Sequence, residues 1–303
     1  MGKIFVVIGI ALFGLFLLFQ SQSRVVLPMQ VASEDKTVTL LFGGDVMLGR
    51  TVTVHSLDTK KDPTYPFTFI KDTFLGADIS LVNLETPILT SCPRRPTGMI
   101  FCAPTEMLRG LTESGIDIVN LANNHTKNYG EAGLIQTKEL LEAEGIKVTG
   151  VGTVTVIEKA HTTFGFIGFD KDQQSNPVLT SLEKKLVTDA NASVDILVVS
   201  LHWGVEYNAH PTEGQKRLAR ELVALGADVI VGHHPHWVQD HETLSGVPVY
   251  YSLGNLVFDQ MWSEETKKGL VVKLTFENRK QIKEELLPIY MKNHAQPQFV
   301  SPQ

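Results

Sequence analysis

Short apolar runs, each the length of one strand, alternate along this chain with segments of helical periodicity. The runs lie at 37–42, 79–83, 116–121, 148–150, 161–169, 196–200, 227–231 and 247–253. Helices are predicted at 105–114, 131–144 and 213–225, and a glycine follows each of them. Runs at 270–276 and 282–288 flank the turn 277–280 and predict a C-terminal hairpin. Strands that alternate with helices predict an α/β architecture.

Polar residues with ligand or acid–base chemistry follow several of these predicted strands. They are Asp45, Glu85, Asn124 with His125, His202, and His234 with His236. One such residue alone commonly caps a turn or a helix, and a His-rich loop can simply lie on the surface. Because α/β folds place their active sites at the carboxyl ends of strands, several such positions in register predict one common site.

The residue types at these strand ends predict a centre for one or two divalent metal ions, such as Mn, Zn or Fe. Carboxylate and carboxamide oxygens combined with neutral imidazoles suit such ions, and two ions ~4 Å apart can hold an attacking hydroxide and an oxyanion. Because His125 is adjacent to Asn124, we expect it to act as a general acid or base, or as an oxyanion donor. Glu206 is expected to orient His202 or to donate a proton. His233 is expected to support the ligands or to contact substrate.

The N-terminus is predicted to enter a membrane. After Lys3, an apolar run of about 16 residues at 4–19 would form a helix of ~24 Å, shorter than the ~30 Å hydrocarbon core. An uncleaved single-pass anchor over 1–20, which we favour, and a cleaved signal peptide both stay open. Residues 21–36 are polar and predict a tether. In either case the folded domain at 37–292, with a tail at 293–303, would lie outside the cytoplasm.

Composition limits the partners and the chemistry of the compartment. The net charge is −6 and the sequence has no basic cluster, which argues against nucleic acid as a partner. The two cysteines, Cys92 and Cys102, flank a turn-rich segment. Outside the cytoplasm they could form a disulfide, or they could stay as two thiols in a loop.

Several stretches of the chain follow one another in an order that matches a known family. They read Gly-Asp-Val-Met-Leu-Gly-Arg at 44–50, Asn-Leu-Glu-Thr-Pro at 83–87, Ala-Asn-Asn-His at 122–125, His-Trp-Gly-Val-Glu-Tyr at 202–207, Gly-His-His-Pro-His at 232–236 and Tyr-Ser-Leu-Gly-Asn at 251–255. In this order they resemble the CapA family of poly-γ-glutamate capsule synthesis, which is related to calcineurin-like metallophosphatases. The resemblance implies a four-layer αββα sandwich. It also implies a membrane-anchored protein that faces outward, with an anionic polymer such as poly-γ-glutamate and membrane synthase or exporter subunits as partners.

The resemblance also implies roles for individual residues. The metal ligands would be Asp45, Glu85, Asn124, His202, His234 and His236, with His125 as the acid or base. The residues that support these ligands or contact substrate would be Asn123, Trp203, His233 and Asn255.

Two positions depart from the metallophosphatase pattern. Met47 stands in place of the histidine of Asp-x-His, and Asn-Leu-Glu at 83–85 replaces Gly-Asp-x-x-Asp. One metal position is therefore short of ligands, so a single metal or a weakly held second one is implied. Two functions stay open. One is a metal-dependent hydrolase or transferase of a γ-glutamyl or other cell-envelope polymer. The other is a non-catalytic subunit of a capsule synthase or exporter, with a vestigial or polymer-binding metal site.

Overall fold

The computed structural model describes residues 37–172 and 176–300. The predicted membrane segment at 1–20 and the tether at 21–36 lie outside the described residues. Within the described residues, no helix is long and apolar enough to cross a bilayer.

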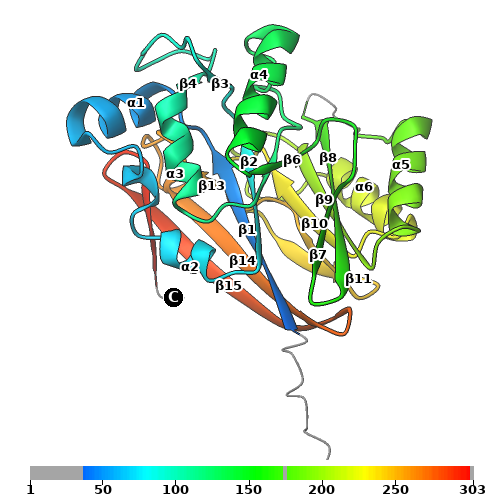
Figure 1. Ribbon diagram of the computed structural model, residues 1–303. Coiled ribbons are helices and arrows are strands. Elements are labelled where there is room, and N and C mark those ends of the chain that lie inside the picture. Colours follow the sequence, from blue (N-terminus) through cyan, green and yellow to red (C-terminus); the bar gives the residue numbers. More distant parts are fainter. Residues whose placement is uncertain (1–36, 173–175, 301–303) are drawn as a thin grey trace, which may run out of the picture. The chain divides into compact units, whose positions relative to one another are not determined.

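Two sheets form the centre of the described domain (Figure 1). The first has the order β16 (Gln296–Phe299), β15 (Lys280–Lys292), β14 (Lys268–Glu277), β1 (Thr37–Val46), β2 (Ile79–Leu84), β5 (Ile118–Asn120) and β6 (Lys147–Thr149), and β13 (Asn255–Val257) pairs with β1. The second has the order β11 (His241–Leu244), β12 (Val247–Tyr250), β10 (Val229–His233), β9 (Ile196–Trp203), β8 (Thr162–Lys171) and β7 (Thr155–Lys159). Strands β1, β2, β5 and β6 are parallel, and so are β8, β9, β10 and β12.

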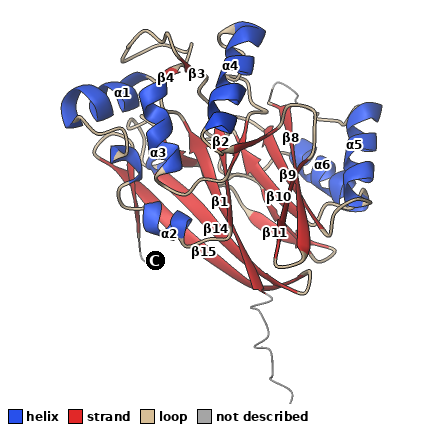
Figure 2. Ribbon diagram, viewed as in Figure 1, coloured by secondary structure: helices blue, strands red, loops and turns tan. Residues whose placement is uncertain are grey.

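Helices cover the outer face of each sheet, as Figure 2 shows. Helices α2 (Lys71–Leu75), α3 (Leu108–Thr112) and α4 (Gly130–Ala143) pack on the first sheet, and α5 (Ser181–Asn191) and α6 (Glu213–Ala224) pack on the second. One apolar cluster lies between the two sheets, and another lies under the helices on each side. The expected α/β fold with two packed sheets is therefore confirmed.

The alternation of side chains along each strand decides which residues reach the layer between the sheets. In β9, Ile196 and Val198 belong to the apolar cluster between the sheets, whereas Leu197 and Val199 pack under the helices. The same inward face continues to His202 near the end of the strand. The inward faces of β2 and β10 likewise end in Asn83 and His233. The apolar layer between the sheets therefore changes into a buried polar cluster at one edge.

Most of the predicted elements are present, but some boundaries differ. The predicted tail at 293–303 contains β16, which pairs with β15, so the sheet continues beyond Lys292. Helix α5 was not predicted, although Thr180 and Glu183 form a capping box at its start. The hairpin turn was predicted, and Asn278 (φ 50) and Arg279 (φ 67) adopt the left-handed backbone that a two-residue turn requires.

Cys92 and Cys102 form a disulfide, with their Cα atoms 5.9 Å apart. This resolves the alternative that the sequence left open. The loop that the disulfide closes lies against helix α1 (Arg50–Thr53), where the Arg50 guanidinium donates to Gly98 O at 3.2 Å. The bridge therefore restrains a loop that is joined to the chain directly after β1.

Replacing both cysteines by serine is expected to lower the free energy of unfolding by about 3 kcal/mol. The reason is the entropy of the unfolded chain, because a cross-link over a sequence separation of 10 closes a short loop. Urea denaturation of the full-length protein measures the loss. Reduction of the wild type should give a similar loss and should leave the double variant unchanged. Equal stability of all samples would contradict this role of the bridge.

Candidate metal centre

Two carboxylates, Asp45 and Glu85, lie fully buried where the layer between the sheets becomes polar. The backbone positions both of them, because Asp45 N donates to Gly254 O (2.9 Å) and Glu85 N donates to Val46 O (2.8 Å). A Cβ atom on Gly44 would lie 2.0 Å from Gly254 O, so only glycine allows this approach. Glu85 Oε2 has no hydrogen-bond partner within the described part of the chain.

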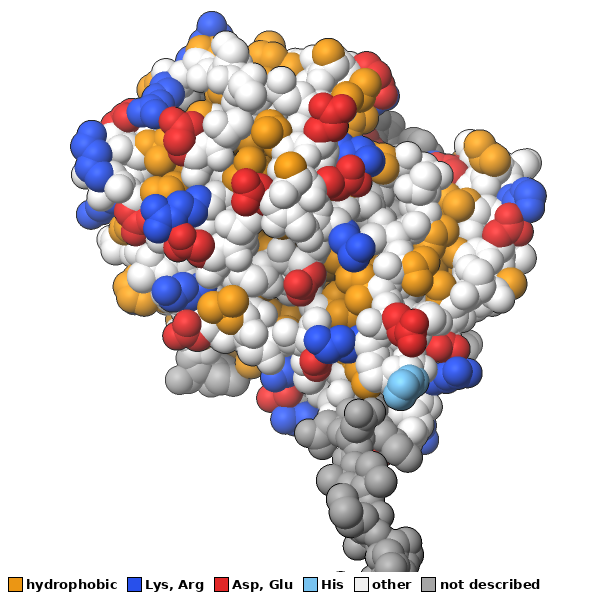
Figure 3. Space-filling view, viewed as in Figure 1, with side chains coloured by type: hydrophobic (Ala, Val, Ile, Leu, Met, Phe, Trp, Pro, Cys, Tyr) orange, Lys and Arg blue, Asp and Glu red, His pale blue; other side chains and the backbone are white. Residues whose placement is uncertain are grey.

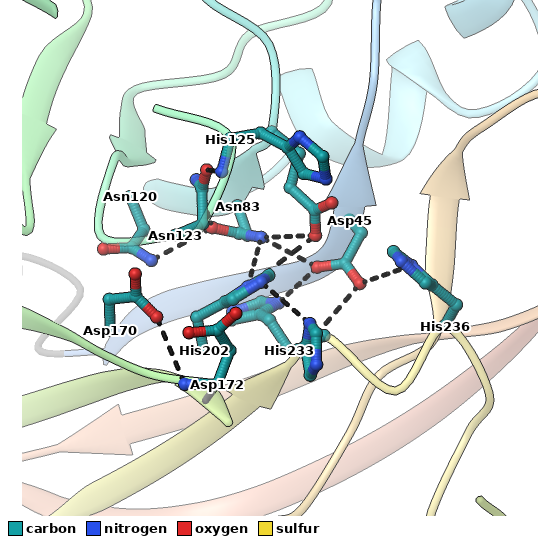
Figure 4. A network of polar contacts seen from close by, with 12 residues as sticks. Asp45, Asn83, Asn120, Asn123, His125, Asp170, Asp172, His202, His233 and His236 are labelled. Carbon is teal, nitrogen blue, oxygen red and sulfur yellow. Dashed lines mark hydrogen bonds and ion pairs between the residues drawn. The ribbon is translucent and has the colours of Figure 1, made fainter. Parts of the chain in front are cut away.

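Asn83, at the inward end of β2, connects the two carboxylates (Figure 4). Its amide nitrogen donates to Asp45 Oδ1 (2.9 Å) and Glu85 Oε1 (3.1 Å), and lies 3.2 Å from His202 Nδ1. Its carbonyl oxygen accepts hydrogen bonds from two further asparagine amides. One buried side chain therefore links groups from β1, β2 and β9.

Three histidines approach the carboxylates from β9 and from the turn after β10. His236 Nδ1 lies 3.2 Å from Asp45 Oδ2, and His234 Nδ1 lies 3.1 Å from His202 Nε2. The backbone N–H of His234 also donates to Asp45 Oδ2 (3.2 Å). His234 (φ 98) and His236 (φ 57) both have positive φ, which costs about 1–3 kcal/mol for each non-glycine residue. This strained turn brings both residues to the same carboxylate.

The orientation of His236 is fixed by its other neighbours. The amide nitrogen of Asn255 donates to Gln260 Oε1 (3.1 Å) and Thr266 O (2.9 Å). The amide oxygen, Oδ1, is therefore the atom that faces His236 Nδ1, at 3.0 Å. His236 Nδ1 therefore faces two acceptors, Asn255 and Asp45, and carries the proton in the protein alone.

The two carboxyl groups titrate in opposite directions. Burial acts to raise the pKa of Asp45, but contacts with His233 and His236 outweigh it and hold this pKa well below its usual value. Burial raises the pKa of Glu85 well above its usual value, and the nearby charge of Asp45 raises it further. In the protein alone these shifts favour the ionised form of Asp45 and the neutral form of Glu85, and a bound cation would favour ionisation of both.

These residues fit a divalent cation. One ligand atom from each of Asp45, Glu85 and His236 lies within 4.8 Å of the others, and all three residues are buried. His202 Nδ1 lies 3.7 Å from Glu85 Oε1. Among the described residues, Glu85 Oε2 and Asn124 Oδ1 are buried oxygens without a hydrogen-bond partner, and such oxygens are donors that divalent ions bind.

His125 lies in the wall of a cavity of about 330 Å³ that His236 also lines. Its ring stacks on Phe101, with the centroids 3.9 Å apart. Asn128 Oδ1 accepts from Phe101 N (2.6 Å) and lies 3.2 Å from His125 Nδ1, so Nδ1 carries a proton. Burial lowers the pKa of His125 to about 4. The ring is therefore neutral at neutral pH and has a lone pair on Nε2.

The same cavity combines aromatic rings with charges of both signs. Its other lining residues include Arg50, Glu206, Tyr207, Phe258, Asp259 and Trp262. The Arg50 guanidinium pairs with Asp259 and lies over the Phe101 ring, 4.6 Å from its centroid. Tyr207 and Trp262 meet edge to face at 4.8 Å.

Residues 39–260 match the family described as bacterial capsule synthesis protein PGA_cap, and this match covers more than half of the chain. The chain belongs to this family. The PGA biosynthesis protein CapA of Bacillus subtilis strain 168 is 28% identical over 289 residues, which cover 88% of this chain and 75% of that protein. The capsule biosynthesis protein CapA of Bacillus anthracis is 30% identical over 264 residues, which cover 78% of this chain and 64% of that protein. The PGA_cap chain therefore spans a little under two-thirds of the second relative.

Solved structures with a similar fold include phosphatases. A phosphatase of Mycoplasma pneumoniae has a TM-score of 0.52 at 12% identity and covers 84% of the PGA_cap chain and 94% of its own. A Staphylococcus aureus protein, described as a 5′-nucleotidase, has a TM-score of 0.55 at 15% identity and covers 85% of this chain and 55% of its own. The PGA_cap chain therefore has a metallophosphatase-like fold, and at these identities the likeness concerns the fold alone.

Most of the predicted site residues of this PGA_cap protein lie together. The buried cluster contains Asp45, Glu85, His202, His234 and His236. Asn123 donates a hydrogen bond to Asn83, and Asn255 contacts His236. Both therefore support residues of the cluster. Asn124 lines a second cavity together with Asn123, and its Oδ1 is buried without a hydrogen-bond partner among the described residues. The roles of these residues as ligands stay predictions.

The expected role of Trp203 is wrong. Successive residues of a strand point to opposite faces, so Trp203 faces away from His202 and packs in the apolar cluster under α5 and α6. Its Nε1 donates to Tyr251 O at 2.8 Å. It therefore contacts neither the ligands nor the cavity beside them.

One further expectation requires correction, and a second is narrowed to the first of its two alternatives. Glu206 does not orient His202, because the chain turns at Gly204 (φ 92) and carries Glu206 to the cavity, 3.9 Å from His236 Nε2. His233 is fully buried, with Nδ1 3.4 Å from Asp45 Oδ1, so it faces the ligand and not a substrate.

Three polar residues in or beside the cluster were not predicted from the sequence, and two of them, Asn83 and Asn120, are fully buried. Asn83 and Asn120 end the inward faces of β2 and β5, and Asp170 lies opposite His202 in the pairing of β8 with β9 (Figure 4). Burial, followed by the charge of Asp172, raises the pKa of Asp170 to about 7. The signal that could have found these residues is the alternation of inward apolar residues along each strand, continued to its end.

Addition of Mn²⁺ to EDTA-treated full-length protein is expected to raise its melting temperature. A ligand at 100 times its Kd that binds only the folded state stabilises it by about 2.7 kcal/mol. Glu85→Gln should lose most of this shift, because it removes a carboxylate from the cluster. Glu158→Gln, on the exposed edge strand β7, is the matched control and should keep the full shift. Equal shifts in both variants would contradict the assignment of Glu85 as a ligand.

Proposed function

We propose that this protein is a metal-dependent hydrolase or transferase that acts on poly-γ-glutamate, or on a related anionic polymer of the cell envelope. The observation that carries this function is the buried group of Asp45, Glu85 and His236, whose ligand atoms lie within 4.8 Å of one another beside an open cavity. The printed names of the two Bacillus relatives, which concern PGA and capsule biosynthesis, support the choice of polymer.

The residues of the centre would have two roles, which are to bind the cation and to accept a proton. A divalent cation held by Asp45, Glu85 and His236 would act as a Lewis acid and would lower the pKa of a bound water. His125, neutral and with its proton on Nδ1, would accept a proton at Nε2 from the attacking group. Asn128 and Phe101 hold the His125 ring in this orientation through the contacts at 3.2 Å and 3.9 Å.

The cavity beside the centre suits a chain of methylene, amide and carboxylate groups. Its aromatic residues Phe101, Tyr207 and Trp262 would pack against methylene groups, and Arg50 would attract a carboxylate. The net charge of −6 offers no general attraction for a polyanion, and basic and acidic side chains are interspersed on the face shown in Figure 3. Local contacts with the cation and Arg50 would therefore supply most of the recognition.

A location at the outer side of the membrane is part of this function. The disulfide between Cys92 and Cys102 supports it, because such bonds persist in oxidising compartments. The apolar run at 4–19 supports a single-pass anchor. An anchored domain would remain close to membrane synthase or exporter subunits that produce the polymer.

The direct test is cleavage or transfer of poly-γ-glutamate by full-length protein in detergent, after EDTA treatment and after return of Mn²⁺, Zn²⁺ or Fe²⁺. Activity should depend on the metal. His125→Ala should lower turnover by about 10²-fold or more while the bound metal stays unchanged. His210→Ala is the control, because His210 is exposed and paired with Asp240 at 2.9 Å. A metal-free protein that is inactive on γ-glutamyl, peptidoglycan and phosphoester substrates would contradict the function.

The second candidate is a non-catalytic subunit of a capsule synthase or exporter. Met47 favours it, because this side chain is fully buried in the apolar cluster under α2, α3 and α4 and supplies no nitrogen or oxygen ligand. On this candidate, His125→Ala leaves capsule production intact, whereas deletion of 4–19 abolishes it. Capsule quantified in cells carrying each variant distinguishes the two functions, since the enzyme requires His125.

A further inference from the structure

We propose that the centre holds a single divalent cation, because the side-chain amide of Asn83 occupies the place that a second cation would need. This rests on the metal-dependent function proposed above and specifies how many ions that function uses. It also gives a role to a residue that is neither a ligand nor in contact with the cavity.

The orientation of the Asn83 amide is determined by its neighbours. Asn120 Oδ1 accepts from Ala122 N (3.2 Å), so its NH₂ must face Asn83. Asn123 Oδ1 accepts from His125 N (3.2 Å), so its NH₂ also faces Asn83. These two amides donate to Asn83 Oδ1 at 3.0 and 3.2 Å. A reversed Asn83 would place NH₂ against NH₂ in a fully buried position, which is unfavourable.

The NH₂ group of Asn83 must therefore point toward the carboxylates. It lies 2.9 Å from Asp45 Oδ1, 3.1 Å from Glu85 Oε1 and 3.2 Å from His202 Nδ1. A cation bound between these three atoms would have to displace an amide that carries partial positive charge. The amide cannot move aside easily, because Asn83 is completely buried and both ends of its side chain are engaged.

His202, which lies beside the Asn83 amide, has neighbours at both of its ring nitrogens. The Asn83 NH₂ group, which can only donate, lies 3.2 Å from His202 Nδ1 and occupies the space in front of that nitrogen. The other ring nitrogen, His202 Nε2, lies 3.1 Å from His234 Nδ1. Both nitrogens of His202 therefore have partners within the protein. By contrast, Glu85 Oε2 has no hydrogen-bond partner in the described ranges and belongs to the group with Asp45 and His236.

The balance of charge also favours one cation. The buried acidic residues at this point are Asp45 and Glu85, and Asn83, Asn120 and Asn123 are neutral. One divalent ion balances two carboxylates. A second divalent ion would add a charge of about +2 that these two carboxylates do not balance, which would weaken its binding. Asn83→Asp removes both obstacles at once. It replaces the donor NH₂ by an oxygen, and it adds a negative charge in a side chain of nearly the same shape.

The test is the number of Mn²⁺ ions bound per chain, measured by titration with EPR detection and by elemental analysis after dialysis. The full-length wild type should bind one ion, and Asn83→Asp should bind two. Asn278→Asp is the matched control, because Asn278 lies in the hairpin turn with φ 50 and should leave the count at one. Melting curves establish that each variant is folded.

Each result decides a separate point. Two ions in the wild type overturn the single-ion centre but leave the metal-dependent function intact. No bound ion in the wild type contradicts the proposed function itself. One ion in Asn83→Asp shows that Asn83 does not exclude the second ion and overturns its role. If Asn83→Asp does not fold, Asn83→Ala replaces it, and it should gain a second ion that binds more weakly than the first. A count of one in Asn83→Ala also overturns the role of Asn83.

Discussion

The contact between two buried carboxyl groups, Asp45 and Glu85, is the constraint on which the rest of the site depends. Their ligand atoms lie within 4.8 Å, and two full charges at this distance would repel by about 3–4 kcal/mol at an effective dielectric of ~20. Backbone N–H groups, the Asn83 amide and the histidines offset this repulsion. The raised pKa of Glu85 reduces it further, because it favours the neutral carboxyl group. A cation would serve the same purpose with both groups ionised.

The fold brings these groups together through the layer between the sheets. Apolar side chains from both sheets fill this layer, and parallel strands of both sheets end at the same edge. Strand β8 approaches the Asn120 side chain closely at Gly168, where a Cβ atom would lie 2.0 Å from Asn120 Oδ1. The glycine therefore leaves space for Asn120, which in turn fixes Asn83. Asn83, Asn120 and His202 are thus held on strands between the two packed sheets.

The sequence predicted the elements of the site better than their orientation. Asp45, Glu85 and the histidines at 234 and 236 were found because each follows an apolar run. Trp203 was misassigned because the apolar run of β9 was taken to end at 200, whereas the strand continues to 203 and alternation sends Trp203 to the opposite face. The orienting role expected for Glu206 was wrong because spacing along the chain does not reveal the turn at Gly204, and its role as a proton donor stays a prediction. Asn83 was overlooked because its contacts reach β1, β5 and β9, and no local pattern records contacts of that range.

The disulfide and the candidate base belong to one connected segment. Cys102 follows Phe101, whose ring stacks on His125 and whose N–H shares Asn128 Oδ1 with the same imidazole. On the other side, a Cβ atom on Gly49 would lie 2.5 Å from Cys102 O, so this segment packs closely against the chain that leaves β1. The covalent bridge therefore restrains the ring that orients His125. Loss of the bridge should affect the wall of the cavity before it affects the carboxylates, because Asp45 and Glu85 are held by the sheet.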